Sequence, residues 1–198
     1  MVTERRRAKI ADVVSQRQRG VVVFEDIADP HNAAAVLRTS EALGFQSVCY
    51  IFEVNEPFDP KRVGKDSSGS ANKWLDFSIY HSTESCLDEL NAQGYETVAT
   101  VADGDADSIL SADLTDPDIA LLFGNEHRGL SEKAVEMADR HLTIPLVGMV
   151  RSLNLSVAAA ICLYEITRQR HQRGIDPFRL PAAEREWLMA SLLERASD

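Results

Sequence analysis

The chain reads IPLVGMVRSLNLSVAAA over residues 144–160. An apolar strand end is followed by a loop that contains proline and glycine, and then by a helix start rich in small residues. Ser152 and Asn154 are residue types that cap helices, and the alanines allow another backbone to approach the helix closely. Taken alone, helix capping is a sufficient explanation for both polar residues.

A second strand, loop and helix precede this stretch and read LLFGNEHRGLS over residues 121–131. The apolar run Ile119–Phe123 is typical of a buried parallel strand, and Ser131 is suited to cap the next helix. Gly124 permits a close backbone approach at the carboxyl end of the strand, where open α/β sheets bind ligands. Ordinary turn chemistry is the alternative explanation for the two glycines.

A third segment joins Pro30-His31-Asn32 to a helix expected at 32–43, with Asn32 as its N-cap. Arg38 lies roughly opposite the apolar stripe of that helix, so its side chain should leave the core. Such an arginine is usually a solvated charge. The alternative is a phosphate clamp, because guanidinium matches phosphate oxygens at two points.

Strands and helices alternate along the chain. We expect strands at 21–25, 47–52, 97–101, 119–123 and 141–145, and helices at 4–16, 32–43, 83–92, 131–139, 154–171 and 182–194. Residues 53–74 read as a long, turn-rich loop. Wholly apolar strands between helices predict a parallel sheet covered on both faces, and the usual topology rules would make it a doubly wound, unknotted domain.

The net charge of −10 argues against a general nucleic-acid coat, but the charge is unevenly distributed. Residues 1–19 hold six basic against two acidic side chains, a local charge of +4, so the remainder carries −14. The basic residues are Arg5, Arg6, Arg7, Lys9, Arg17 and Arg19. An RNA-facing arm and a solvated helix face both explain this asymmetry.

Several classes of protein are excluded by absent signals. No apolar stretch approaches the roughly 20 residues of a spanning helix, and the N-terminus lacks the apolar core of a signal peptide. The three cysteines are widely separated and give neither a disulfide framework nor metal spacing, so we expect a cytoplasmic protein without a metal. Dinucleotide, P-loop and nucleophile-elbow motifs are missing.

The three segments together resemble the TrmH-type RNA 2′-O-ribose methyltransferases of the SPOUT superfamily. Residues 32–44 resemble the family's asparagine–arginine motif, residues 123–130 its FGxExxGL motif and residues 144–158 its IPxxGMxxSLNxSVA motif. The resemblance covers about residues 5–173, with Arg151 at a variable position. Ser67–Leu75 and the terminal helices most resemble the enzymes that methylate guanosine 18 of tRNA.

The resemblance implies a parallel-sheet α/β fold whose C-terminal half forms a deep trefoil knot, which replaces the unknotted topology expected above. The knotted loops would lie at about 100–104, 124–130 and 144–154. We expect a basic N-terminal helix over 1–19, the methyltransferase domain over 20–174 and a helical extension over 175–198. Family members are homodimers with shared active sites, and the helix after Asn154 suits the contact between subunits.

The implied reaction transfers a methyl group from S-adenosylmethionine to a ribose 2′-hydroxyl, which RNA has and DNA lacks. By resemblance Arg38 is catalytic. Because arginine stays protonated, its better role is to hold an RNA phosphate that assists the hydroxyl proton. The residues implied to support catalysis are Asn32, Glu126, Ser152 and Asn154. Those implied to hold the cofactor are Thr100, Gly124, Ile144, Met149 and Leu153. Those expected to bind tRNA phosphates are Arg5, Arg6, Arg7, Lys9, Arg168, Arg170 and Arg173.

Other functions remain open at this point. The same chemistry at another tRNA position or on ribosomal RNA is the nearest alternative. A catalytically silent RNA-binding dimer and an unrelated α/β nucleotide-binding module belong to different classes.

Overall fold

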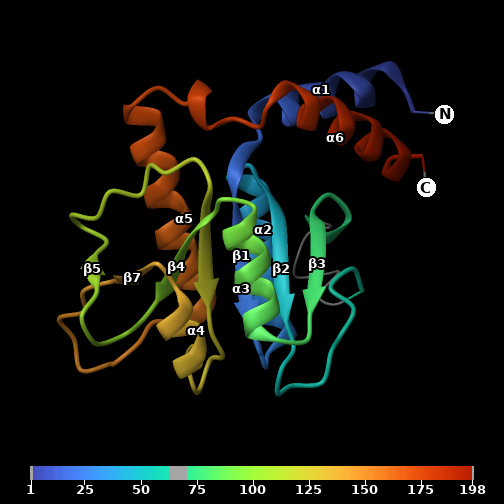
Figure 1. Cartoon of the computed structure of the whole chain (residues 1–198). Coiled ribbons are helices and arrows are strands. Elements are labelled where there is room, and N and C mark those ends of the chain that lie inside the picture. Colours follow the sequence, from blue (N-terminus) through green and yellow to red (C-terminus); the bar gives the residue numbers. More distant parts are fainter. Residues whose placement is uncertain (1, 63–70, 198) are drawn as a thin grey trace.

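A parallel β-sheet forms the centre of the computed structural model, which describes residues 2–62 and 71–197 (Figure 1). Its strands are β1 (Gln18–Glu25), β2 (Phe45–Ile51), β3 (Asp76–Tyr80), β4 (Glu96–Thr100), β5 (Asp107–Ser108), β6 (Ile119–Phe123) and β7 (Arg140–Thr143). In the described residues the strand order is β3-β2-β1-β6-β4-β7-β5, and every pairing is parallel. The predicted parallel sheet is confirmed.

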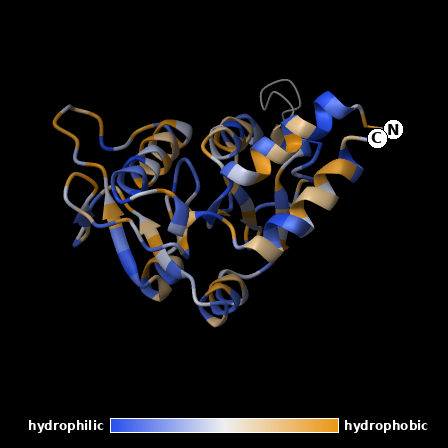
Figure 2. Cartoon of the chain, turned by 90° about the horizontal axis from the view of Figure 1, so that it is seen from above, coloured by the Kyte–Doolittle hydropathy of each residue, from blue (hydrophilic) through white to orange (hydrophobic). Residues whose placement is uncertain are grey.

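Helices cover both faces of the sheet. They are α1 (Glu4–Gln16), α2 (Pro30–Ala42), α3 (Thr83–Ala92), α4 (Glu132–Met137), α5 (Leu155–Gln172) and α6 (Ala182–Arg195), with short 3₁₀ turns at Ala71–Lys73 and Asp176–Phe178. Residues of α2 and α5 belong to the core on one face of the sheet, and residues of α3 and α4 to the core on the other face. The view from above shows helices on both sides of the sheet (Figure 2). Of the helices described here, none has the length and apolarity to cross a membrane.

The central strand β1 explains this layering. Its side chains alternate between faces, so Val22 and Phe24 join the core under α2 and α5, while Val21 and Val23 join the core under α3 and α4. All four are buried. A strand buried on both faces needs apolar residues at every position, which is why the run Val21–Phe24 does not alternate with polar residues.

Three local details differ from the prediction. Strands β3 and β5 were not expected, because β3 is partly exposed and β5 has only two residues. Helix α2 begins at Pro30, and Asp29 caps it by accepting a hydrogen bond from the His31 amide at 2.8 Å. Asn32 as the N-cap was therefore wrong: proline at the first helical position and the preceding aspartate start the helix two residues earlier. Positions 67–70 of the Ser67–Leu75 segment lie outside the described residues.

Helices α1 and α6 pack against each other at the amino ends of the strands (Figure 1). Ile10 and Val14 of α1 form a small buried cluster with Leu188 and Leu192 of α6. Because α1 ends at Gln16 and β1 starts at Gln18, the pair is attached where the first strand begins. The proposed boundaries at 19 and 174 stay a prediction.

Arg170 corrects the predicted RNA-binding cluster. Its side chain is fully buried and donates to Gln18 Oε1 (2.8 Å) and to the carbonyls of Arg19, Asp116 and Pro117 (2.6, 2.8 and 3.3 Å). Burial lowers the pKa of this guanidinium to about 10, against the opposing effect of nearby aspartates. The prediction that Arg170 binds RNA is wrong, because its donors hold the fold together.

Two further basic residues of the expected arm serve the fold. Arg17 is buried and donates to the Glu41 carbonyl (2.8 Å) and carboxylate (3.2 Å), and Arg19 pairs with Asp118. Neither can act as a free phosphate ligand. The basic residues of α1 that remain exposed are Arg5, Arg6, Arg7 and Lys9.

Candidate active site

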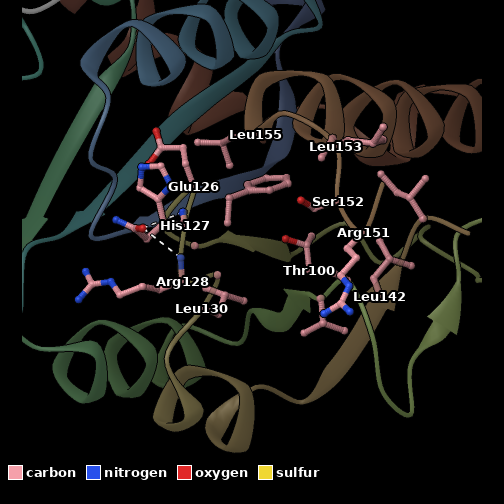
Figure 3. A pocket seen from close by; sticks show the side chains of 18 of the residues that line it. Thr100, Glu126, His127, Arg128, Leu130, Leu142, Arg151, Ser152, Leu153 and Leu155 are labelled. Atoms are coloured by element: carbon pink, nitrogen blue, oxygen red, sulfur yellow. Dashed lines mark hydrogen bonds between the residues drawn. The ribbon is translucent and has the colours of Figure 1, made fainter. Parts of the chain in front are cut away.

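The loops that follow β4, β6 and β7 meet the start of α5 around a cavity of about 410 Å³ (Figure 3). Thr100, Gly124, Ile144 and Leu153 all line it, although they lie far apart in the sequence. The structure thus brings together four of the five residues predicted to hold a cofactor. The cavity stands at the carboxyl ends of the strands, where ligands bind in open α/β sheets.

Met149 is the exception. Its side chain is fully exposed and is not part of the cavity wall, and the neighbouring Val147 is exposed to the same degree. The loop between β7 and α5 turns both side chains outward, so placing Met149 against a cofactor was wrong for this chain.

Gly124 is required by the shape of the loop after β6. A Cβ atom there would lie 2.1 Å from the Leu130 amide nitrogen and 2.4 Å from the Gly129 carbonyl oxygen. The loop is closed by two backbone hydrogen bonds between Asn125 and Gly129, at 3.0 and 2.8 Å. The glycine therefore reflects close contact of the loop with itself, beyond ordinary turn chemistry.

Glu126 fastens this loop to the start of α2. Its carboxylate accepts hydrogen bonds from the backbone amides of Ala28 (2.9 Å) and Asp29 (3.1 Å) and from Asn32 Nδ2 (3.1 Å). Burial raises the pKa of Glu126, but these hydrogen bonds outweigh it and hold the pKa below its ordinary value of 4.5. A carboxylate stabilised in this way is a poor proton acceptor and a good structural anchor.

Asn32 and Asn154 continue the same network. Asn154 Nδ2 donates to Asn32 Oδ1 at 3.1 Å, while Asn154 Oδ1 caps α5 by accepting from the Ser156 amide at 2.9 Å. The Asn154 side chain thus caps α5 and also takes part in the hydrogen-bond network of the site. Ser152 is exposed and lines the cavity beside Arg151.

Arg38 stands apart from these residues. It is exposed on α2, while Ala33, Val36 and Leu37 are buried, so the predicted orientation is confirmed. The side chain does not contribute to the cavity wall. One chain therefore places Glu126 and Ser152 on the cavity wall, links Asn32 and Asn154 to Glu126 by hydrogen bonds, and leaves Arg38 outside this group.

Two residues that support the loop were missed. Asn125 Nδ2 donates to the Asp26 carbonyl at 2.7 Å, and Asn125 Oδ1 accepts from the amides of His127 and Arg128. Buried Glu25 accepts from the amide and the hydroxyl of Ser131, both at 2.7 Å. An acid at the end of an otherwise apolar strand was the signal in the sequence for Glu25.

Glu126→Gln should lower cofactor affinity roughly tenfold at neutral pH, because an amide cannot accept all three hydrogen bonds. The folded pKa of Glu126 is lowered, so its stabilising effect is present above pH 4.5 and is lost as pH falls through the folded pKa. Melting curves should therefore show a gap between the two proteins at neutral pH that closes in acid. A gap independent of pH would contradict this role.

No group of three or more histidine, cysteine, aspartate and glutamate side chains in residues 2–62 and 71–197 is placed to hold a metal ion.

Comparison with known proteins decides the family. The model of the SpoU rRNA Methylase family matches residues 19–164, which include all three motif segments and the whole cavity wall. The chain belongs to this family. Members of the SpoU family are RNA methyltransferases, and two of the similar structures are crystals with S-adenosylmethionine bound.

Several SpoU family relatives match nearly the full chain. A tRNA (guanosine(18)-2′-O)-methyltransferase of Thermus thermophilus is 38% identical over 174 residues, 87% of each chain. An enzyme of the same name from Escherichia coli is 32% identical and covers 93% of this chain and 80% of its own. The crystal structure of an A. aeolicus TrmH/SpoU tRNA modifying enzyme superposes with a TM-score of 0.86 at 28% identity, covering 98% and 96% of the two chains.

Proposed function

We propose that this protein transfers the methyl group of S-adenosylmethionine to the ribose 2′-hydroxyl of guanosine 18 in tRNA. The observation that carries the proposal is the cavity, because the motif segments 123–130 and 144–158 supply much of its wall. The first motif segment is joined to that wall by the hydrogen bond from Asn32 to Glu126. The near full-length relatives with this activity narrow the substrate to tRNA. A cytoplasmic setting, as expected from the sequence, suits that substrate.

The cavity fits the cofactor in size and chemistry. Its volume of about 410 Å³ lies in the range of small-molecule sites. The wall is mostly apolar, with Leu130, Leu142, Ile144 and Leu155, and also includes Thr100 and Gly124. Apolar walls with a few polar groups suit an adenosine ring system. When bound, the cofactor supplies a methyl group on a good leaving group, so the chemistry needs no metal.

The residues of the chain have to align the hydroxyl and handle its proton. Glu126, Asn32 and Asn154 are bound to one another and fix the loop after β6 against α2 and α5. Ser152 is exposed and lines the cavity, where it would contact the ribose. Arg38 would hold a neighbouring RNA phosphate, which takes or polarises the proton of the hydroxyl.

We further propose a homodimer in which Arg38 serves the cavity of the partner subunit. Apolar side chains of α5 that face solvent support this arrangement: Val157, Ile161 and Tyr164 are 47%, 36% and 60% exposed. Leu110 beside them is 84% exposed, and together they border a second hollow. A contiguous apolar surface of this kind is typical of an interface.

The wild-type protein should sediment at about twice the 21.9 kDa chain mass. Ile161→Asp should produce an inactive monomer, because a charge at the centre of an apolar interface is costly to desolvate. Trp187→Asp is the matched control, since Trp187 is also exposed but lies on α6. An active monomer would refute the interface and the shared site.

The trefoil knot remains part of the proposal. It would tie the loops at 100–104, 124–130 and 144–154, the same segments that form the cavity wall. The sheet order, which sets β6 between β1 and β4 and brings β7 to the other side of β4, is compatible with it.

The exposed bases of α1 are proposed to bind tRNA phosphates. Replacing Arg5, Arg6, Arg7 and Lys9 by glutamine should weaken tRNA binding and reduce its salt dependence, by a slope of roughly 0.7–0.9 per lost phosphate contact. Cofactor affinity should stay unchanged, because α1 lies at the opposite end of the sheet from the cavity. An unchanged salt slope would identify the cluster as a solvated face.

Arg168 and Arg173 are proposed to contribute more weakly to the binding of tRNA phosphates. They are paired with Glu165 (2.6 Å) and Asp113 (2.9 Å), so RNA would have to compete with these carboxylates.

Mapping of 2′-O-methyl groups tests the function directly. tRNA from a strain lacking the gene should miss one methyl group at guanosine 18, and the purified protein with S-adenosylmethionine should restore it. Methylation only at another tRNA position or on ribosomal RNA would replace the proposed substrate. A methyl group on a base would reject the ribose assignment, and binding of tRNA without transfer would favour the silent RNA-binding dimer.

A further inference from the structure

Three side chains that are charged at neutral pH line the cavity, and two of them already have partners. Glu126 is engaged by Ala28, Asp29 and Asn32. Arg128 lies 4.0 Å from the carboxylate of Asp26. Arg151 makes no hydrogen bond or ion pair with the residues that the structure describes. The cavity therefore contains one guanidinium available for a ligand.

The two arginines extend in different directions. Arg151 extends from the loop before α5 toward Thr100 and Leu142, whereas Arg128 extends to the other side, away from Ser152 (Figure 3). The cavity wall also includes the apolar side chains of Leu142, Ile144 and Leu146. A ligand held by Arg151 would carry an anionic group.

S-adenosylmethionine meets this description, because its methionine part ends in an α-carboxylate. A carboxylate that leaves water without a partner costs several kcal/mol, and a guanidinium can accept it at two points. We propose that Arg151 binds the α-carboxylate of the cofactor. The inference rests on the proposed function.

An RNA phosphate is the competing ligand for Arg151. The direction of the side chain favours the carboxylate, since Arg151 reaches toward residues of the cavity wall, which lies at the carboxyl ends of β4 and β7. A phosphate of bound RNA would approach from the open side. The two ligands predict different losses when Arg151 is replaced.

Calorimetry distinguishes a carboxylate contact from a phosphate contact. It compares the binding of S-adenosylmethionine with that of decarboxylated S-adenosylmethionine, which differs only in lacking the carboxylate. Wild-type protein should bind the decarboxylated form about tenfold more weakly than S-adenosylmethionine. This loss is at the lower end of the range for a charge-assisted hydrogen bond, because Arg151 is partly solvated. Arg151→Ala should weaken S-adenosylmethionine about tenfold and leave the decarboxylated form unchanged, so that the two affinities become equal. Arg151→Lys should recover part of the difference. Arg128→Ala, the control of equal charge on the other rim, should keep the wild-type ratio.

A wild-type affinity ratio that persists in Arg151→Ala would overturn the inference and leave the proposed function intact. The same holds if Arg151→Ala weakens tRNA binding and leaves S-adenosylmethionine binding unchanged, which would identify a phosphate contact. Wild-type protein that binds neither cofactor form would overturn both the inference and the proposed function.

Discussion

Arg38→Ala should transfer methyl groups at least about 100-fold more slowly than the wild type in single-turnover assays. The reason is that the proposed contact between Arg38 and the RNA phosphate matters most in the transition state, so kcat falls more than binding. The melting temperature should change little, since Arg38 is exposed and lies outside the apolar stripe of α2. Arg38→Lys should recover little activity, because ammonium lacks the planar two-point grip.

Mixing two inactive variants shows which subunit Arg38 serves. Arg38→Ala retains an intact cavity, and Gly124→Ala retains an intact Arg38. If Arg38 acts on the partner's cavity, mixed dimers regain one working site, and exchange at equal amounts restores about a quarter of the wild-type activity. If Arg38 acts within its own chain, mixing restores nothing. A fully folded Arg38→Ala protein that transfers methyl at the wild-type rate would remove Arg38 from the mechanism.

Gly124→Ala should abolish cofactor binding, with an affinity loss of roughly 100-fold or more, because the loop that forms one wall of the cavity cannot keep its shape. The added methyl group would lie 2.1 Å from a backbone nitrogen, which cannot rotate away as a side-chain end can. Overpacking typically costs about 1–3 kcal/mol, so the melting temperature should fall by roughly 3–10 °C.

Gly148→Ala is the matched control, since Gly148 lies in another loop near the cavity and a Cβ atom there meets nothing within 4 Å. Its cofactor affinity and melting temperature should equal those of the wild type. If Gly124→Ala binds S-adenosylmethionine normally in calorimetry, the close contact between Gly124 and Leu130 does not determine the cavity.

The parts of the fold that the sequence predicted are those with strong local signals. The continuous apolar runs of β1 and β6 and the long helix α5 appear where the pattern placed them. Strand β3 was missed because its half-exposed edge position removes the apolar pattern, and β5 because two residues form no pattern. The helix start at Pro30 depends on a competition between two capping residues, Asp29 and Asn32, that composition alone does not decide.

The candidate site shows the same limit at the level of side chains. Six of the ten residues expected to be catalytic or to hold the cofactor line the cavity. The sequence could not distinguish a basic residue that stabilises the fold from one that is available to a ligand. Arg168 and Arg170 belong to one basic run, but Arg170 is buried among carbonyl groups and Arg168 is partly exposed. Met149 and Leu153 lie in one motif, but the loop turns only Leu153 toward the cavity. These differences arise from long-range packing, which no local pattern records.

The α1–α6 pair and the cavity lie at opposite ends of the sheet within one chain. A five-residue strand such as β4 spans about 17 Å, so the two ends are separated by at least that length. The rigid strands therefore keep a fixed distance between the surface proposed to bind the body of the tRNA and the cavity at which one nucleotide is presented. Because of this separation, RNA selection and methyl transfer depend on different parts of the chain. Changes in the terminal helices would alter which RNA is bound and would leave the residues around the cavity unchanged.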